Sequence, residues 1–379
     1  MLRVFGSDTG ERELTEVKRV LDSEWLGYGP ASKEFERRFS ERIGQDFILV
    51  NSCSNALYLA VKLLNLPKGA QVILPTWTHA ACANAIILNG LEPVFCDIDP
   101  ETLNATPETI QACTSKDTAA VMVVDYGGYP VNINGITRLG FPVIEDAACA
   151  VDSKCDRGQY CGTIADIGCY SFDSMKNLTM GEGGGLTSAN KHIMERARYL
   201  RYSGFAESGL DRAGRTARWW DVEMREPSLR FLPSDVNAGI GLAQLSRLPQ
   251  MQNKRRILAG VYNNDLPWPD HVALPPSHMY HSWFTYAIQV DAEIRDDLAH
   301  FLLDQDIYTT MRYPPLHLMP AYGAAMGNSG EAAGVAYKSL PMAERMANEV
   351  LNLPLHPRMS TDDAARVASA VWEFFRLRG

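Results

Sequence analysis

Short apolar segments alternate with helical segments along most of the chain, and this alternation limits the folds open to it more than any other feature. Strand, helix and strand in succession are typical of a parallel sheet covered by helices on both faces. Strands are expected at the FILV segment, 71–74, 93–96, 119–124, 142–144 and 167–172. Helices are expected at 11–21, 32–43, 55–64, 79–89, 108–113 and 191–202. The predicted fold class is therefore α/β.

A change of pattern between Asp235 and Asp265 indicates a second domain. The segment DVNAGIGLAQLSRL and the basic stretch after it predict long helices at this point. We expect a large domain over 1–250, with the N-terminal segment, and a smaller α+β domain over 251–379. The 379 residues, 46% hydrophobic and 21% charged, are enough for both cores.

The charge of the chain argues against several classes of partner. A net charge of -9 disfavours a nucleic-acid partner, because phosphate binding needs concentrated Lys and Arg. No apolar run approaches the length of a membrane span, and the first residues lack the apolar core of a signal peptide. We therefore expect a cytoplasmic protein without a membrane partner.

The eight cysteines all lie in the first half of the chain and contain no C-x-x-C motif. This spacing is poor for structural zinc and unusual for the disulfide framework of a secreted protein. We predict reduced thiols, most of them in the core, and no metal site.

One lysine, Lys176, lies in YSFDSMKNLTMGEGGG between an apolar strand end and a run of small, flexible residues. About thirty residues upstream, the strand in FPVIEDAA ends in Glu145 and Asp146. An aldehyde cofactor that acts as an electron sink needs an amine to hold it as a Schiff base and an anion beside its pyridine nitrogen. Lys176 and Asp146 can supply these groups. A solvated loop lysine and an acidic helix N-cap are the alternatives that these residues leave open.

Several motifs resemble the sugar aminotransferases of the DegT/DnrJ/EryC1/StrS family, in the family's order from about Trp25 to the C-terminus. They are SFDSMKNLTMGEGGG, VIEDAA, NSCSNALYLAV, ILPTWTHAACANAIILNGLEPVFCDID, and the tail from HSWFTYAIQV through RYPPLHLMPAY to LPMAERMANEVLNLPLHP. The resemblance implies fold type I of the pyridoxal-phosphate enzymes, like aspartate aminotransferase. It also implies a mostly parallel seven-stranded sheet in the large domain.

The resemblance assigns cofactor-binding roles beyond Lys176 and Asp146. Ser54 and Asn55, in a stretch similar to the family's SGTAAL, and Ser171 are expected to bind the cofactor phosphate; simple helix capping and a strand-end serine are the alternatives. His79 stands where the family has an aromatic residue stacked on the cofactor ring. Cys149 replaces a glutamine expected near the cofactor's phenolic oxygen, a change that can shift the pKa of the Schiff base.

Other positions are expected to contact a neighbouring subunit or the substrate. Arg230 is similar to a family position that reaches the cofactor phosphate of the second subunit, which implies a homodimer with shared sites; a surface arginine is the alternative. In the substrate region the resemblance places Tyr28 and Gly29 of GYGP, and Arg312, Tyr313 and His317 of MRYPPLH. Arg312 replaces a histidine of the family.

The resemblance implies a two-stage transamination in which L-glutamate, the usual donor of the family, donates its amino group and leaves pyridoxamine 5'-phosphate. The second stage aminates a nucleotide-linked keto-deoxysugar, with a dTDP-4-keto-6-deoxyhexose as first candidate, to give an amino sugar nucleotide for antibiotic glycosides or surface polysaccharide. The alternatives are a 3-keto sugar or keto-cyclitol substrate, a sugar dehydratase of the same fold, and a regulatory protein that has lost catalysis. Lys176 argues against the dehydratase, in which the family has histidine, and against loss of catalysis.

Overall fold

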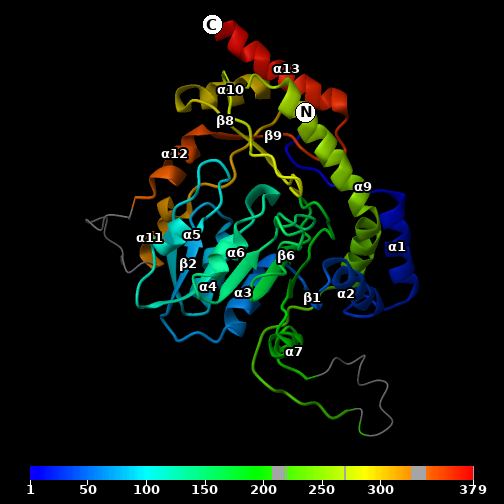
Figure 1. Cartoon of the computed structure of the whole chain (residues 1–379). Helices are drawn as coiled ribbons and strands as arrows, with labels where there is room; N and C mark the ends of the chain where they lie inside the picture. The colour runs from blue at the N-terminus through cyan, green and yellow to red at the C-terminus, as the bar shows by residue number, and fades with distance from the viewer. Residues whose placement is uncertain (207–217, 219, 269, 326–338, 379) are drawn as a thin grey trace.

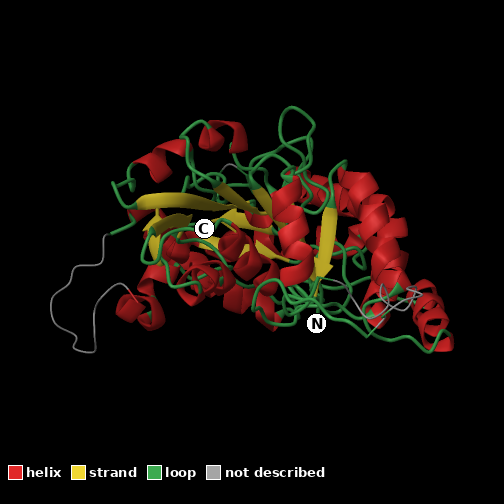
Figure 2. Cartoon of the chain, turned by 90° about the horizontal axis from the view of Figure 1, so that it is seen from below, coloured by secondary structure: helices red, strands yellow, loops and turns green. Residues whose placement is uncertain are grey.

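A computed structural model of the chain describes residues 1–206, 218, 220–268, 270–325 and 339–378. Within these residues a seven-stranded sheet forms the centre of the molecule, in the order β1-β7-β6-β5-β4-β2-β3, with helices on both of its faces (Figure 2). Its strands are β1 (Phe47–Val50), β2 (Gln71–Pro75), β3 (Glu92–Cys96), β4 (Thr118–Val124), β5 (Val143–Asp146), β6 (Ile167–Ser171) and β7 (Gly184–Thr187). Neighbouring strands are parallel except at β7, which is antiparallel to both β1 and β6. The predicted α/β class and mostly parallel sheet are confirmed.

Strand β7 corrects the description of the glycine run as flexible. Gly184 and Gly185 are buried strand residues, and each lacks a Cβ because the space is filled. A Cβ on Gly184 would lie 2.3 Å from the backbone nitrogen of Cys53, and one on Gly185 would lie 2.1 Å from the ring of Phe47. These glycines therefore serve close packing rather than mobility.

The helices of the described residues are α1 (Glu11–Asp22), α2 (Pro30–Ile43), α3 (Cys53–Leu63), α4 (Ala80–Leu88), α5 (Pro107–Gln111), α6 (Ile133–Thr137), α7 (Lys191–Leu200), α9 (Asp235–Asp265), α10 (Ala292–Asp304), α11 (Pro320–Ala325), α12 (Pro341–Glu349) and α13 (Thr361–Arg378). The helices α1 to α5 and α7 agree with the predicted segments to within a few residues, whereas α6 and α10 to α13 had no predicted counterpart. The long helices expected from Asp235 onward are one continuous helix, α9, which contains Pro249. Figure 1 shows α9 beside α1 and α2 at one end and near β8 and β9 at the other.

A second, two-stranded antiparallel sheet is present in the C-terminal part of the described chain, made of β8 (Tyr286–Gln289) and β9 (Val350–Leu353). It shares a separate hydrophobic core with α10, α13 and the last turns of α9. The predicted domain boundary at residue 250 falls inside α9 and stays a prediction; residues 269, 326–338 and 379 of the predicted smaller domain lie outside the described residues. Leu340 and Met346 of the same C-terminal part pack into the core of the large sheet.

Among the residues that the structure describes, no helix is both long enough and apolar enough to cross a membrane.

Candidate active site

A cavity of about 500 Å³ opens at the carboxyl ends of β1, β2, β5 and β6, the edge where α/β proteins bind ligands. Many of the predicted site residues line it: Ser54, His79, Asp146, Ser171, Lys176, Arg312 and Tyr313. They come from separate strand ends and from a loop of the C-terminal part, so the sheet brings together residues far apart in sequence. Asn55, Cys149, His317, Tyr28, Gly29 and Arg230 are not among the lining residues.

Lys176 reaches the cavity through a tight turn after β6. In this turn the Lys176 backbone nitrogen donates to the Asp173 carbonyl at 3.0 Å, and the Met175 nitrogen donates to the Asp173 carboxylate at 3.0 Å. The Lys176 ammonium donates to the Cys149 sulfur at 3.3 Å and lies 4.4 Å from the ring centroid of Phe284. Burial acts to lower the pKa of Lys176, while the Asp146 carboxylate acts to raise it, and the net shift is upward.

Asp146 is the last residue of β5, and its carboxylate is buried at the wall of the cavity. One oxygen accepts from the Ala148 backbone nitrogen at 3.0 Å, and the other accepts from the Cys82 thiol at 3.2 Å. A carboxylate has about four acceptor sites, so these contacts leave capacity for a further N–H donor from a ligand.

The start of α3 provides an anion-binding end to the cavity. Ser52 is the N-cap and accepts from the Asn55 backbone nitrogen at 3.2 Å, and Ser54 faces the cavity in the first turn. The first N–H groups of a helix have no partner within the helix, and they favour phosphate. Ser171, at the end of β6, lines the same cavity. The Asn55 side chain donates instead to Asn51 at 2.7 Å.

His79 and Tyr313 form another part of the wall. His79 is the N-cap of α4, and its ring meets the Tyr313 ring edge-on at 5.5 Å between centroids. Burial, and then the charge of Lys176, lower the pKa of His79, so its ring is neutral at neutral pH. A neutral imidazole at this wall is compatible with the predicted stacking role, which stays a prediction.

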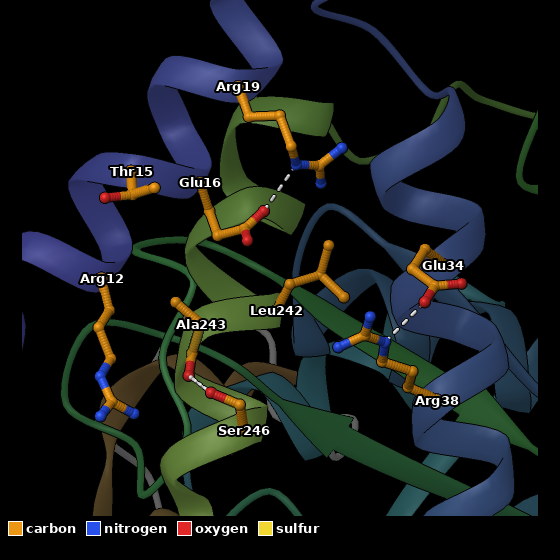
Figure 3. A pocket seen from close by; sticks show the side chains of 9 residues that line it. All are labelled: Arg12, Thr15, Glu16, Arg19, Glu34, Arg38, Leu242, Ala243 and Ser246. Carbon is orange, nitrogen blue, oxygen red and sulfur yellow. Dashed lines mark hydrogen bonds and ion pairs between the residues drawn. The ribbon is translucent and has the colours of Figure 1, made fainter.

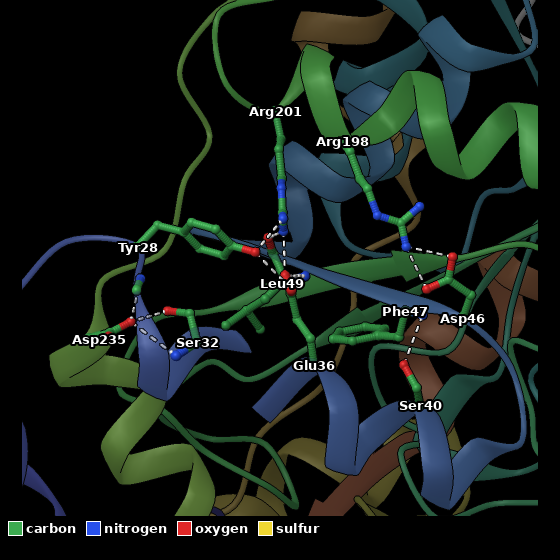
Figure 4. A network of polar contacts seen from close by, with 11 residues as sticks. Tyr28, Ser32, Glu36, Ser40, Asp46, Phe47, Leu49, Arg198, Arg201 and Asp235 are labelled. Carbon is green, nitrogen blue, oxygen red and sulfur yellow. Dashed lines mark hydrogen bonds and ion pairs between the residues drawn. The ribbon is translucent and has the colours of Figure 1, made fainter. Parts of the chain in front are cut away.

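Two predicted substrate residues, Tyr28 and Gly29, belong to a polar network at the start of α2, in which Figure 4 shows Tyr28 beside Glu36 and Arg201. The Tyr28 hydroxyl donates to Glu36 at 3.0 Å and accepts from Arg201 at 2.8 Å. The Gly29 nitrogen donates to Asp235 at 2.9 Å, and a Cβ there would lie 2.8 Å from the same carboxylate. Their contacts within this chain are structural, and the predicted contact with substrate stays a prediction.

His317 and Arg230 also lie away from the lining residues. The His317 ring is buried between the Thr76 hydroxyl, at 2.7 Å, and the Glu344 carboxylate, at 3.3 Å. Arg230 is exposed, with its guanidinium 5.5 Å from the Tyr202 ring centroid. The residue after it, Phe231, accepts a backbone hydrogen bond from Asn51 at 2.9 Å, just ahead of α3.

The sequence reasoning missed several residues of the cavity wall: Cys53, Asp173, Met175, Glu182 and Thr310. Asp173 and Met175 lie within three residues of Lys176 in the sequence. This proximity could have predicted that they line the same cavity. Thr310 lies two residues before Arg312, so the same signal was available for it.

A second hollow, of about 550 Å³, lies between α1, α2 and α9 (Figure 3). Arginines in it pair with glutamates of their own helices, Arg19 with Glu16 at 2.9 Å and Arg38 with Glu34 at 2.6 Å. None of the predicted site residues lines it.

Comparisons with known proteins identify the family of the chain. Residues 7–372 match the model of the DegT/DnrJ/EryC1/StrS aminotransferase family. A dTDP-4-dehydro-2,3,6-trideoxy-D-glucose 4-aminotransferase of Saccharopolyspora spinosa is 39% identical over 96% of this chain and 94% of its own. The spore coat polysaccharide biosynthesis protein SpsC of Bacillus subtilis is 34% identical over the same shares.

Among solved structures, the aminotransferase TlmJ of Streptoalloteichus hindustanus is similar with a TM-score of 0.90 and 38% identity, over 100% of both chains. The match of the family model extends over nearly the whole chain, and the relatives cover it equally widely. The predicted sugar aminotransferase is thus confirmed at the level of the family, and this chain belongs to the DegT/DnrJ/EryC1/StrS aminotransferase family.

Proposed function

We propose that this chain uses pyridoxal 5'-phosphate to transfer the amino group of L-glutamate to a nucleotide-linked keto-deoxysugar. The first candidate is a dTDP-4-keto-6-deoxyhexose. The observation that carries the proposal is that the Lys176 amine and the Asp146 carboxylate, from different strand ends, line one cavity. The name of the relative from Saccharopolyspora spinosa supports the choice of a dTDP-linked 4-keto sugar.

The residues of the cavity fit the cofactor. Lys176 would anchor its aldehyde, and the buried Asp146 carboxylate retains acceptor capacity for the ring N–H. The N-terminus of α3 with Ser54, together with Ser171, would bind the phosphate. When bound, pyridoxal phosphate supplies a carbonyl that captures an amine and a ring that spreads the negative charge of the reacting carbon.

The chain's own residues would handle the protons. Lys176, once free, would take the proton from the donor's α-carbon as a general base and deliver it as a general acid to the carbon that had carried the cofactor's aldehyde. Asp146 would keep the ring nitrogen protonated through both stages. Its burial excludes competing water, which strengthens this charge interaction.

We further propose a homodimer in the cytoplasm. Arg230 is exposed and lies next to the segment that leads into α3, which suits a side chain that reaches the phosphate site of a second copy. Cys82, Cys96 and Cys169 are buried thiols outside any disulfide, and this supports a reducing compartment.

Absorbance spectra of the protein loaded with pyridoxal phosphate test the proposal. We expect glutamate to remove the band of the bound aldehyde form and one nucleotide-linked keto sugar, from a panel of 3-keto and 4-keto compounds, to restore it. Lys176→Ala is the control: it should keep the circular dichroism of the wild type and lose turnover. A wild-type band that does not respond to glutamate would contradict the proposed donor.

A further inference from the structure

The Asp146 carboxylate accepts a hydrogen bond from a buried thiol, that of Cys82. The Cys82 sulfur lies 3.2 Å from one carboxylate oxygen, and the Ala148 backbone nitrogen lies 3.0 Å from the other. A second thiol, that of Cys53, is 3.9 Å from the oxygen that Ala148 contacts, which is long for a hydrogen bond. Cys82 is therefore the thiol with the closer contact to Asp146.

The direction of this hydrogen bond follows from the groups around the sulfur. A carboxylate only accepts, so the S–H of Cys82 donates to Asp146. The Thr78 hydroxyl lies 3.1 Å from the same sulfur, and because a thiol has a single hydrogen, Thr78 is the donor in that contact. Burial, and then the charge of Asp146, raise the pKa of Cys82 well above its usual range, so the thiol keeps its proton. Thr78, Cys82 and Asp146 thus form a chain of hydrogen bonds with one direction.

The start of α4 holds the two donors of this chain. Thr78 and Cys82 lie on either side of the N-cap residue His79, and the Cys82 backbone nitrogen donates to the His79 carbonyl at 3.1 Å. The side chains of Thr78 and Cys82 are completely buried. Asp146 lines the cavity with Lys176, and Cys82 is not among the lining residues. An effect of the thiol on a ligand therefore passes through the carboxylate.

The two donors fix the orientation of the Asp146 carboxylate. Ala148 holds one oxygen and Cys82 holds the other, so a rotation of the carboxylate would break both contacts. An S–H group is a weak donor, and it withdraws less of the negative charge than a hydroxyl or a cationic donor. The carboxylate is thus held in one orientation and retains its charge for an N–H group in the cavity.

We infer that Cys82 is a positioning residue, which holds Asp146 in the orientation that binds the ring N–H of the cofactor. This inference rests on the proposed function, because the ring N–H belongs to the proposed cofactor. It adds to that function a residue that acts from outside the cavity.

The dissociation constant of pyridoxal 5'-phosphate, measured by titration of the apoprotein, tests the inference. Cys82→Val keeps the bulk and removes the donor, whereas Cys82→Ser keeps a donor in a smaller side chain. We expect Cys82→Val to raise the constant about 10-fold, because one hydrogen bond to a charged group is lost. Cys82→Ser should stay within about threefold of the wild type. The reverse order of the two variants would show that Cys82 serves packing, and would overturn the inference.

Cys96→Val is the matched control. Cys96 is a fully buried thiol of β3 that packs in a different hydrophobic core, so this variant should bind the cofactor like the wild type. Circular dichroism shows whether each variant is folded. If Cys82→Val does not fold, Cys82→Ala takes its place, with the same expected loss.

A thermodynamic cycle with Asp146→Asn isolates the path through the carboxylate. If Cys82 acts through Asp146, adding Cys82→Val to Asp146→Asn should change the dissociation constant by less than about twofold. Losses that add in the double variant would show a separate structural effect of Cys82 and would overturn the inference.

The two half-reactions, measured separately, show where the loss lies. Asp146 would contact the cofactor ring and neither substrate. Cys82→Val should therefore lower the maximal rates of both half-reactions by a similar factor of about 10 and leave the glutamate concentration at half-maximal rate unchanged. A loss confined to that concentration would overturn the inference.

The S–H stretching band in the infrared spectrum tests the hydrogen bond without the cofactor. The band that Cys82→Val removes should lie at lower frequency in the wild type than in Asp146→Asn, because a carboxylate is a stronger acceptor than an amide. A band that does not move would show that the thiol does not donate to Asp146, which overturns the inference.

The outcome for the proposed function is distinguishable from the outcome for this inference. A wild type without affinity for pyridoxal 5'-phosphate would refute the proposed function and this inference with it. A wild type that binds the cofactor, and a Cys82→Val variant that binds it equally well, would refute this inference alone.

Discussion

Glu145 and Asp146 are neighbours at the end of β5, and their side chains occupy opposite faces of the sheet. Asp146 lies at the wall of the cavity, where a backbone N–H and a thiol donate to it. Glu145 is enclosed on the other face beside Asp125 and Cys161, with one ligand atom of each residue within 4.8 Å of the others. The chain therefore places two carboxylates one residue apart in opposite environments.

The difference shows that burial and neighbouring groups, more than residue type, determine the chemical role of a carboxylate. Burial raises the pKa of Glu145 to about 7, and burial together with the charge of Glu145 raises the pKa of Asp125 well above its usual range. Two enclosed carboxyl groups this close share a proton. Asp146, in contrast, has donors around it and an opening to a ligand, which suits a carboxylate that must stay charged.

The largest expected effect is the loss of activity in Asp146→Asn. If Asp146 lies next to the cofactor ring, as the proposed function requires, replacing its charge should lower kcat/KM by about 10²- to 10³-fold or more, because a preorganised charge at the reacting group is lost. Cofactor affinity should fall as well. The matched control is Glu145→Gln, the same kind of change on the other face, which should keep activity within a few-fold. Comparable losses in the two variants would refute the assigned difference between the faces.

The intermediate effect is on the pH dependence of stability. Because the pKa of Glu145 is raised from its ordinary 4.5 to about 7, the folded protein binds more protons than the unfolded chain between these values. Stability from this group is therefore present at low pH and is lost as pH rises through about 7, by on the order of 3 kcal/mol.

Glu145→Gln should remove this fall of the free energy of unfolding with pH. Relative to the wild type, the variant should therefore be more stable above pH 7 than below it. Urea unfolding at pH 5.5 and pH 8 measures it, with the exposed Glu293→Gln as control. Parallel pH profiles for wild type and Glu145→Gln would show that Glu145 carries no such proton.

The smallest expected effect is at Cys149. Burial raises the pKa of this thiol, so it is neutral at neutral pH, and its contact with Lys176 is one weak hydrogen bond. Cys149→Ala should lower kcat/KM by about fivefold, because it removes this hydrogen bond. Cys161→Ala, the thiol on the opposite face beside Glu145, should leave kcat/KM unchanged. Steady-state kinetics would show a hundredfold loss in Cys149→Ala if the thiol were essential.

The sequence was sufficient for β1 to β6 of the large sheet and for most helices up to α9, for the α/β class, and for the family, which the match over residues 7–372 confirms. These features are local: apolar runs of strand length, helical periodicity and short motifs carry them without knowledge of distant contacts. For the same reason the predicted strand ends brought Lys176 and Asp146 together correctly in one cavity.

Only the tertiary structure decided which residues surround these groups. It turned the glycine run into a central strand, because Gly184 and Gly185 pack where a Cβ has no room. It placed His317 against Thr76, 241 residues away, and set Arg312 at the wall of the cavity with Lys176. Such contacts join residues that are far apart in the sequence. They are determined by how distant segments pack against each other, and a local sequence pattern carries no information on that packing.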